Sequence, residues 1–439
     1  MVSIIMMTGY VFWDIISPLS TQMRAPVSEG GLSWSSVEYG FYAGSYSLFN
    51  IFLLMLFFGG IILDKCGIRL TGMLATGAML LGAIVNYLAL TSISPSVTTH
   101  VWFTLFGLIP STLKLQVLIA SLGFALFGVG CDITGITVSK IITKWFTGHE
   151  LASAMGAQVA MARLGTASAL SLSPVLSQYF GLPVSVLAGV VVLLLGFVLF
   201  FFYTFVDRKA DKVQSYSKIE DHSTDNNFHF SDFVKVISNS FFWIIAILCV
   251  CYYSSIRPFM KFATDLLVNE YNVQQSLAGW IVSAIPYGTI ILTPFFGMIY
   301  DRVGHGVWLM MAGCLLLMGS HLALAYPLVH SIGYALLIMV LIGIAFSMVP
   351  AALWPSIPKL VPIKQLGTAY SITYFIQNVV PILVGKVIDA HTSTNGHVDY
   401  TQAMLIFALF ACAGVLSSCI LLLFDKKQNL GLENKNINS

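Results

Sequence analysis

The feature that most constrains this chain is its succession of apolar stretches, each long enough to cross the ~30 Å hydrocarbon core of a bilayer as a helix. Hydrophobic residues make up 57% of the sequence and charged residues only 9%, whereas about a quarter of a soluble domain is normally charged. The chain is therefore predicted to be an all-α membrane protein with twelve transmembrane helices. The expected spans are residues 3–22, 39–62, 70–92, 115–139, 150–176, 183–206, 240–263, 277–299, 306–326, 331–354, 365–388 and 401–424.

The distribution of Lys and Arg supports this count and gives an orientation. With the N-terminus inside, 15 of the 21 basic residues fall on the cytoplasmic side, as the positive-inside rule requires. The first span begins almost at Met1, without a basic n-region or a small-residue cleavage site, and is expected to be a membrane span rather than a signal peptide. The basic residues are dispersed, so nucleic acid is not an expected partner.

One long hydrophilic segment, residues 207–239, divides the spans into six and six. We expect an N-terminal six-helix bundle over 1–206, a cytoplasmic linker over 207–239, a C-terminal six-helix bundle over 240–425 and a disordered cytoplasmic tail over 426–439. Two weak repeats indicate related halves. GGIILDKCGIRL after the second span is similar to FGMIYDRVGHGV after the eighth, and KWFTGHELASAM is similar to KLVPIKQLGTAY at an offset of 215 residues.

The G-x-x-x-D-x-x-G-x-R turn, found after the second span and more weakly after the eighth, resembles the loop signature of the major facilitator superfamily. The resemblance implies two six-helix bundles that rock about a central site, with the Asp and Arg of each turn latching neighbouring helices on the cytoplasmic side. The alternative is an ordinary tight basic turn. The gating residues expected from the motif are Gly60, Asp64, Gly67 and Arg69 in the first half and Gly297, Asp301, Arg302 and Gly304 in the second.

A closer resemblance extends along the whole chain, in the segments YVFWDIISPLSTQ, FFGGIILDKCGIR, KWFTGHELASAMGAQVAMARLG, CVCYY and ALWPSIPKLVPIKQLGTAYSITYFIQN. In this order they resemble the lysosomal dipeptide uniporter branch of that superfamily. In that branch an acid on the fourth helix and an arginine on the fifth handle the peptide. The corresponding positions here are Asp132 and Arg163, with the same spacing of 31 residues. The branch has Glu where this chain has Asp132, which shortens the reach of the carboxylate by one methylene.

The same two residues stand out on physical grounds. A charge at bilayer depth costs about 2.5–3.5 kcal/mol on the insertion scale, so it faces protein, water or a ligand rather than lipid. Asp132 lies about 12 Å from the Lys140 end of its helix, and Arg163 about 20 Å from Glu150. The rigid guanidinium fork suits a carboxylate and Asp132 can accept from an α-ammonium group, which indicates a site for a zwitterion. The alternative is that the two residues pair and tie their helices together.

Other polar and aromatic residues of the spans are expected to line the site. At the 215-residue offset, the counterparts of Asp132 and Arg163 are Ser347 and Asn378, so the second half offers neutral groups in place of charge. Asp14 is a second intramembrane acid and the main rival of Asp132 for a substrate amine or a proton. The predicted substrate-binding residues are Asp132, Arg163, Asp14, Tyr10, Tyr46, Asn50, Tyr253, Trp354, Tyr370, Tyr374, Gln377 and Asn378.

Two of the spans are expected to be discontinuous, 3–22 at Pro18 and 240–263 at Pro258, because each proline frees a backbone carbonyl in a helix that carries polar residues. Pro381 is expected to act as a hinge in the span 365–388. Arg257 and Lys261 are expected near the outer surface, where they guide anions or snorkel to the interface.

These features favour an alternating-access transporter for small zwitterionic solutes, and specifically a dipeptide uniporter. The alternatives within transport are a proton-coupled symporter that uses Asp14 or Asp132 and a carboxylate or anion exchanger. The alternative of another class is a non-transporting membrane receptor or subunit. An enzyme is not expected, because no Ser/His/Asp set, no metal-ligand spacing and no P-loop occurs, and no catalytic residue, metal or cofactor is predicted.

The expected partners are a small-molecule substrate, a dipeptide or similar zwitterion, and the lipid bilayer, with the protein as a monomer. The sequence does not specify whether an accessory subunit binds, the direction of flux or the preferred side chains. No N-x-[ST] sequon and no outer-loop cysteine occurs. These observations favour a bacterial cytoplasmic membrane over a lysosomal membrane.

Overall fold

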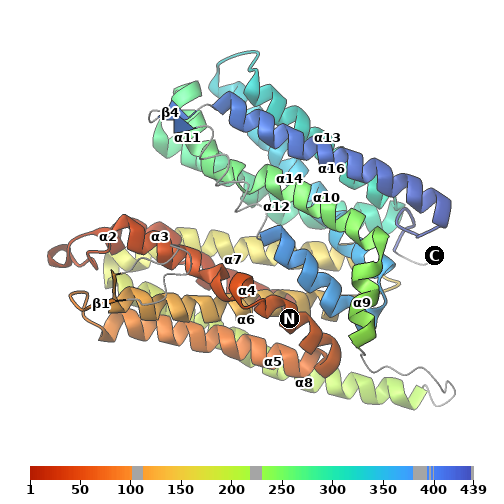
Figure 1. Ribbon diagram of the computed structural model, residues 1–439, viewed down its shortest axis with the longest axis horizontal. Coiled ribbons are helices and arrows are strands. Elements are labelled where there is room, and N and C mark those ends of the chain that lie inside the picture. The colour runs from red at the N-terminus through yellow and green to blue at the C-terminus, as the bar shows by residue number, and fades with distance from the viewer. Residues whose placement is uncertain (101–111, 218–229, 379–392, 395–396, 399, 437–439) are drawn as a thin grey trace. The chain divides into compact units, whose positions relative to one another are not determined.

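The computed structural model describes residues 1–100, 112–217, 230–378, 393–394, 397–398 and 400–436. These residues are helical apart from short connections and two antiparallel two-stranded ribbons (Figure 1). The prediction of an all-α membrane fold is confirmed. The chain divides into two compact units, Met1–Val138 with Met161–Asn227, and Ser139–Ala160 with Phe228–Ser439.

The N-terminal part contains a core in which α1 and α5 both pack on α8, and Figure 1 shows α5 and α8 side by side. Large aromatic side chains, Phe12, Tyr42 and Phe127 among them, fill this core. The elements are α1 (Val2–Asp14), η1 (Ser17–Leu19), α2 (Ser20–Arg24), η2 (Val27–Glu29), α3 (Ser36–Gly44), η3 (Ser45–Ser47), α4 (Leu48–Phe52), α5 (Met55–Ser92), β1 (Thr98–His100), β2 (Thr112–Lys114), α6 (Leu115–Phe146), α7 (Leu151–Phe180) and α8 (Leu182–Ser217).

In the C-terminal part, α13 packs between α14 and α16, α12 packs on α14, and α10 packs on α16 (Figure 1). The elements are α9 (Phe230–Ser238), α10 (Ser240–Ile256), α11 (Phe259–Tyr271), α12 (Gln275–Val303), α13 (Gly306–Ala325), α14 (Ile332–Leu360), η4 (Ile363–Gln365), β3 (Ser393–Thr394), β4 (His397–Val398) and α16 (Tyr400–Gln428). A further helix covers residues 366–378.

Nine helices among the described residues are long and apolar enough to cross a membrane. Three further predicted spans take other forms. The second and third expected spans share α5, which continues past Gly67 although the φ of 80° and ψ of 172° at that residue are non-helical. The seventh is divided between α10 and α11, and the part of the eleventh after residue 378 lies outside the described residues.

The prediction of one continuous helix over 39–62 is wrong. The chain there forms α3, a 3₁₀ turn at η3, α4 and then α5, which begins after Leu54 in a left-handed conformation with φ of 51°. Small polar residues explain the break, because the Ser45 hydroxyl donates to the Tyr42 carbonyl at 2.7 Å and so competes with the helical backbone.

The predicted discontinuities of the first and seventh spans are confirmed. α1 ends at Asp14 and the chain continues through a 3₁₀ turn that contains Pro18. α10 ends at Ile256, and α11 starts at Phe259, directly after Pro258. A proline lacks the backbone N–H and crowds the preceding turn, which ends the regular helix.

Both hydrophilic segments contain more structure than the sequence analysis expected. α8 continues to Ser217, and α9 occupies Phe230–Ser238, so helices extend into the segment 207–239. The tail was expected to be disordered, but its described part folds back on the second unit, where Leu432 is fully buried. The Glu433 carboxylate caps the first turn of α13 by accepting from the Val307 N–H at 2.7 Å.

Candidate functional site

Asp132 lies in α6 and is almost fully buried, with 6% of its surface exposed. The Tyr46 hydroxyl donates to its Oδ1 at 2.8 Å and the Asn50 amide donates to its Oδ2 at 2.6 Å. Both donors come from the irregular segment η3–α4. Hydrogen bonds to a charged group are worth about 1.5–3 kcal/mol each, so these two stabilise an ionised carboxylate. The structure thus brings together three of the predicted site residues.

A glycine allows this arrangement. Gly128 lies one helical turn before Asp132, and a Cβ atom at that position would lie 2.1 Å from the Tyr46 carbonyl oxygen. The Asn50 amide also reaches the Gly128 carbonyl, at 3.3 Å. Any side chain at position 128 would push the η3–α4 segment away, and with it both donors to the carboxylate.

An aromatic group covers the Tyr46 side of Asp132. The Trp13 indole stacks on the Tyr46 ring, with centroids 4.2 Å apart and an interplanar angle of 9°. The Tyr10 ring lies against the Trp13 ring, with centroids 5.2 Å apart. Trp13 was not among the predicted site residues. Its place directly before Asp14, on the helix that carries Tyr10, was the available signal.

The second predicted acid, Asp14, lies half-buried at the end of α1. The Thr166 hydroxyl of α7 donates to its Oδ2 at 2.6 Å. Arg163, also half-buried and one turn earlier on α7, is close enough to act electrostatically on this carboxylate. α1 and α7 therefore contribute an acid and a base to the same unit that contains Asp132. Thr166 is a further residue that the sequence analysis missed.

In the second unit, the predicted aromatic residues form a cluster. The Trp354 ring lies 4.8 Å from the Tyr374 ring and 6.2 Å from the Tyr370 ring. Tyr370 is fully buried, and its hydroxyl lies 3.3 Å from the Thr143 hydroxyl at the end of α6. The helix 366–378 therefore turns this predicted face into the protein. Pro381, the expected hinge, lies outside the described residues.

The polar end of the same helix face carries Gln377 and Asn378. The Cys249 thiol of α10 donates to the Gln377 side chain at 3.8 Å. The Asn378 oxygen accepts from the Arg257 guanidinium at 2.8 Å, and this guanidinium also lies over the Tyr253 ring, 5.1 Å from its centroid. The structure therefore places Arg257 against two predicted site residues, where the sequence analysis expected an interfacial anchor.

The first gating turn is held by its arginine. The Arg69 Nε donates to the Asp207 carboxylate of α8 at 2.6 Å, and the same guanidinium contacts Asp211. The Asp207 side chain is fully buried. The turn itself depends on Gly67, whose positive φ is costly for any other residue. Arg69 thus contacts a neighbouring helix, and its role as a gating latch stays a prediction. Asp207 had been assigned to the linker.

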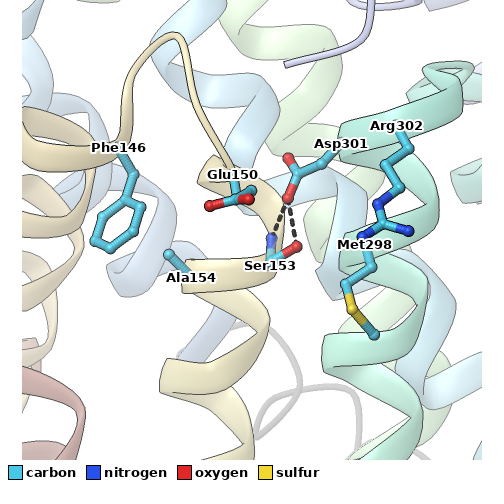
Figure 2. A pocket seen from close by; sticks show the side chains of 7 residues that line it. All are labelled: Phe146, Glu150, Ser153, Ala154, Met298, Asp301 and Arg302. Carbon is cyan, nitrogen blue, oxygen red and sulfur yellow. Dashed lines mark hydrogen bonds between the residues drawn. The ribbon is translucent and has the colours of Figure 1, made fainter. Parts of the chain in front are cut away.

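The second gating turn is held by its aspartate. Asp301 is fully buried and accepts from the Ala152 N–H at 2.8 Å and the Ser153 N–H at 2.6 Å. The Ser153 hydroxyl donates to the same carboxylate at 2.5 Å, and the Asn436 amide donates at 2.8 Å. Figure 2 shows the carboxylate directed at the first turn of α7. It thus satisfies free backbone donors at a helix N-terminus, where a negative charge is favourable.

The close approach of α12 to α7 requires the predicted Gly297. A Cβ atom there would lie 2.6 Å from the Ala152 carbonyl oxygen. Beside this contact is a cavity of about 290 Å³ lined by residues of the α6–α7 hairpin and α12 (Figure 2). The lining residues are Phe146, Glu150, Ser153, Ala154, Met298, Asp301 and Arg302.

The remaining predicted gating residues have different surroundings. Arg302 is exposed, and its side chain runs beside Met298 (Figure 2). It forms no hydrogen bond or ion pair with the part of the chain that the structure describes. The basic residue that the repeat has near the position of Arg69 is His305, whose Nδ1 lies 3.0 Å from the Glu433 carboxylate. Gly304 has a φ of 83° and leads into α13. Gly60 is buried within α5, and Asp64 is half-buried on the same helix.

The chain is similar in sequence to several characterised proteins. They share the name "Lysosomal dipeptide transporter MFSD1". The protein from Bos taurus is 27% identical over 78% of this chain and 70% of its own length. The protein from Danio rerio is 26% identical over 88% of this chain and 78% of its own length. The protein from Homo sapiens is 24% identical over 96% of this chain and 84% of its own length.

Solved structures with little sequence identity have the same fold. The proton:xylose symporter XylE matches with a TM-score of 0.68 at 13% identity, over 96% of this chain and 95% of its own. The transporter FucP, in the outward conformation, matches with a TM-score of 0.64 at 14% identity, over 95% and 97%. The profile of the Major Facilitator Superfamily matches residues 2–385. The chain belongs to the Major Facilitator Superfamily of membrane transporters, which are not enzymes.

Proposed function

We propose that this transporter carries small zwitterionic solutes, and dipeptides in particular, by uniport. The observation that supports this proposal most directly is the buried carboxylate of Asp132, which accepts hydrogen bonds from Tyr46 and Asn50. A buried carboxylate can bind a substrate α-ammonium group in exchange for part of that group's hydration. The name shared by the relatives, at 24–27% identity, supports the same substrate class.

Arg163 supplies charge of the opposite sign in the same unit, and Asp14 acts on it electrostatically. A planar guanidinium binds carboxylates with two parallel hydrogen bonds, which suits a carboxylate of the substrate. Trp13 and Tyr46 offer apolar ring faces next to the acid, and ring faces tolerate many side chains. This combination favours a carrier that recognises the backbone charges of a dipeptide more strongly than its side chains.

Proton-coupled symport is the second candidate, because Asp14 is an intramembrane carboxylate with a hydroxyl donor of its own, Thr166. A carboxylate that alternates between protonated and ionised states is a natural coupling site. Uptake into proteoliposomes with and without a proton ionophore distinguishes the two candidates. Uniport predicts unchanged equilibration of the dipeptide, whereas symport predicts accumulation that depends on the pH gradient.

The substrate itself is tested by a competition panel. Thermal shift of the purified protein with dipeptides, tripeptides, single amino acids and dicarboxylates is expected to single out dipeptides. Uptake of a labelled dipeptide is expected to fall at least tenfold in Asp132→Asn and to remain unchanged in Glu270→Gln, which alters an exposed carboxylate of α11. Anion uptake that is unaffected by Asp132→Asn would indicate an exchanger. Dipeptide binding without flux would indicate a receptor or subunit.

The membrane and the assembly belong to the same proposal. We assign the protein to a bacterial cytoplasmic membrane, acting as a monomer, in line with the missing glycosylation sequon. Detection of the endogenous protein in a glycosylated endomembrane fraction, or its copurification with a stoichiometric subunit, would refute this assignment.

A further inference from the structure

Arg257 is a charged residue with neutral partners in the spanning part of the second unit. It follows α10 and precedes Pro258, and its side chain is half-buried. One of its five N–H groups donates to the Asn378 oxygen, and the guanidinium plane lies over the Tyr253 ring. Among the described residues, no carboxylate lies within ion-pair distance of Arg257.

The position of Asn378 along its helix indicates where this charge lies. Asn378 lies twelve residues after Leu366, about 18 Å along the helix that begins there. That distance exceeds half of a ~30 Å hydrocarbon core. The contact with Asn378 therefore ties the guanidinium to a helix within the predicted span 365–388. An amide and a ring orient a cation, but they do not neutralise it.

The two halves differ in the charged residues at corresponding positions. Arg163 and Asn378 are equivalent at the 215-residue offset. In the first half, position 163 holds the base, and the nearby broken helix contributes Asp14. In the second half, position 378 is neutral and the broken helix contributes Arg257 instead. Alignment of Pro18 with Pro258 places Ser254 opposite Asp14, so the second half has a base without the corresponding acid.

We propose that Arg257, oriented by Asn378 and Tyr253, binds a carboxylate of the transported solute. This inference rests on the proposed function and adds a determinant of its specificity. The guanidinium has four further N–H groups in a planar fork, the geometry that a carboxylate accepts bidentately. The carboxylate is either the C-terminal group of the peptide or that of an acidic side chain, and both offer the same chemistry.

The competing role for Arg257 is structural, as a tie between the end of α10 and the helix 366–378. A structural tie requires only the hydrogen bond to Asn378 and predicts no dependence on substrate charge. A carboxylate receptor predicts that affinity depends on whether the substrate carries the carboxylate. Substrate pairs that differ in one carboxylate therefore separate the two roles.

The test measures binding by thermal shift and uptake by the full chain in proteoliposomes. One pair is alanyl-alanine and its C-terminal amide, and the other is alanyl-glutamate and alanyl-glutamine. The unsubstituted protein is expected to prefer the acid at least tenfold in one pair, which identifies the source of the carboxylate. Arg257→Gln is expected to reduce that ratio to about one, whereas the control Arg208→Gln, an exposed arginine of α8, keeps it.

A second measurement uses the unsubstituted protein and therefore does not require that a variant folds. Phenylglyoxal modification of Arg257, located by peptide mass spectrometry, is expected to slow at least fivefold with the preferred acid but not with its neutral partner. Equal modification with both ligands, or an acid preference that survives in Arg257→Gln, would overturn the inference and leave dipeptide transport standing. Failure of the unsubstituted protein to bind or transport any dipeptide would instead refute the proposed function.

Discussion

Replacement of Asp301 by asparagine tests whether this carboxylate holds the α6–α7 hairpin on α12. The carboxylate is fully buried and receives four hydrogen bonds, two of them from the backbone of the first turn of α7. The substitution keeps the size and shape of the side chain. It changes one acceptor oxygen into an amide donor and removes the negative charge.

The expected cost follows from these contacts. Asparagine retains one oxygen for the Ala152 N–H but directs an NH₂ group at the Ser153 N–H. One buried donor is then left without an acceptor, which costs about 1–3 kcal/mol. Loss of the charge at the N-terminus of α7 adds about 0.3–1 kcal/mol. The sum, roughly 1.3–4 kcal/mol, weakens the contact between α7 and α12 roughly ten- to a thousandfold.

Exposure of a buried position on α12 measures this change. Thr293 is fully buried, and its hydroxyl has no hydrogen-bond partner among the described residues, so Thr293→Cys is a mild substitution. A Cβ atom at Gly156 of α7 would lie 3.0 Å from the Thr293 carbonyl oxygen, which shows that α7 covers this part of α12. In a Cys66→Ser background, which removes an exposed thiol, labelling with a membrane-impermeant maleimide reports release of the hairpin.

Asp301→Asn is expected to accelerate labelling at least tenfold. The matched control is Glu150→Gln, which removes an exposed carboxylate from the same cavity, where it makes no hydrogen bond with the described residues. The control is expected to label at the parental rate within about twofold. If both variants label equally fast, Asp301 does not hold this contact, and the assignment of the second turn as a gate is refuted.

Three further substitutions test other contacts. Arg69→Ala removes the guanidinium from the fully buried Asp207 carboxylate of α8. Because Arg69 itself is 31% exposed, we expect a loss of about 1–3 kcal/mol in the free energy of unfolding, seen as a lower melting temperature in detergent. An equal effect of Arg302→Ala would contradict this. Glu433→Ala removes the cap of α13, worth about 1 kcal/mol, and is expected to speed carboxypeptidase digestion of the tail roughly fivefold; unchanged digestion would show that the tail does not depend on this cap. Tyr46→Phe removes one donor to Asp132, worth about 1.5 kcal/mol, and is expected to weaken dipeptide binding about tenfold by thermal shift; unaltered affinity would count against Asp132 as a ligand.

The sequence was most informative where a property is local. A stretch of about twenty apolar residues is sufficient for a transmembrane helix, because the bilayer requires its backbone to be satisfied internally. The breaks at Pro18 and Pro258 follow in the same way from the missing N–H of proline. The two turns predicted to be gates were recognised because glycines and charged residues repeat at fixed offsets, and Gly67 does have a positive φ.

The sequence was least informative where small local effects compete. The second span is apolar enough to read as one helix, yet serine side chains and Leu54 divide it into short segments. The described tail is polar by composition, but Leu432 and the Glu433 cap hold it on the second unit. In both cases a few hydrogen bonds, each worth about 1 kcal/mol, override the average character of the segment.

The sequence by itself determined that this chain is a membrane transporter of a known superfamily and which residues bring charge into its spans. Tertiary structure alone decided which of these residues meet. Tyr46 reaches Asp132 across 86 positions of the chain, and Arg257 reaches Asn378 across 121. Hydropathy specifies the depth of a residue, but the rotation of each helix and the closeness of its neighbours specify its partners. These depend on packing along the whole helix, at positions such as Gly128, and no local pattern encodes them.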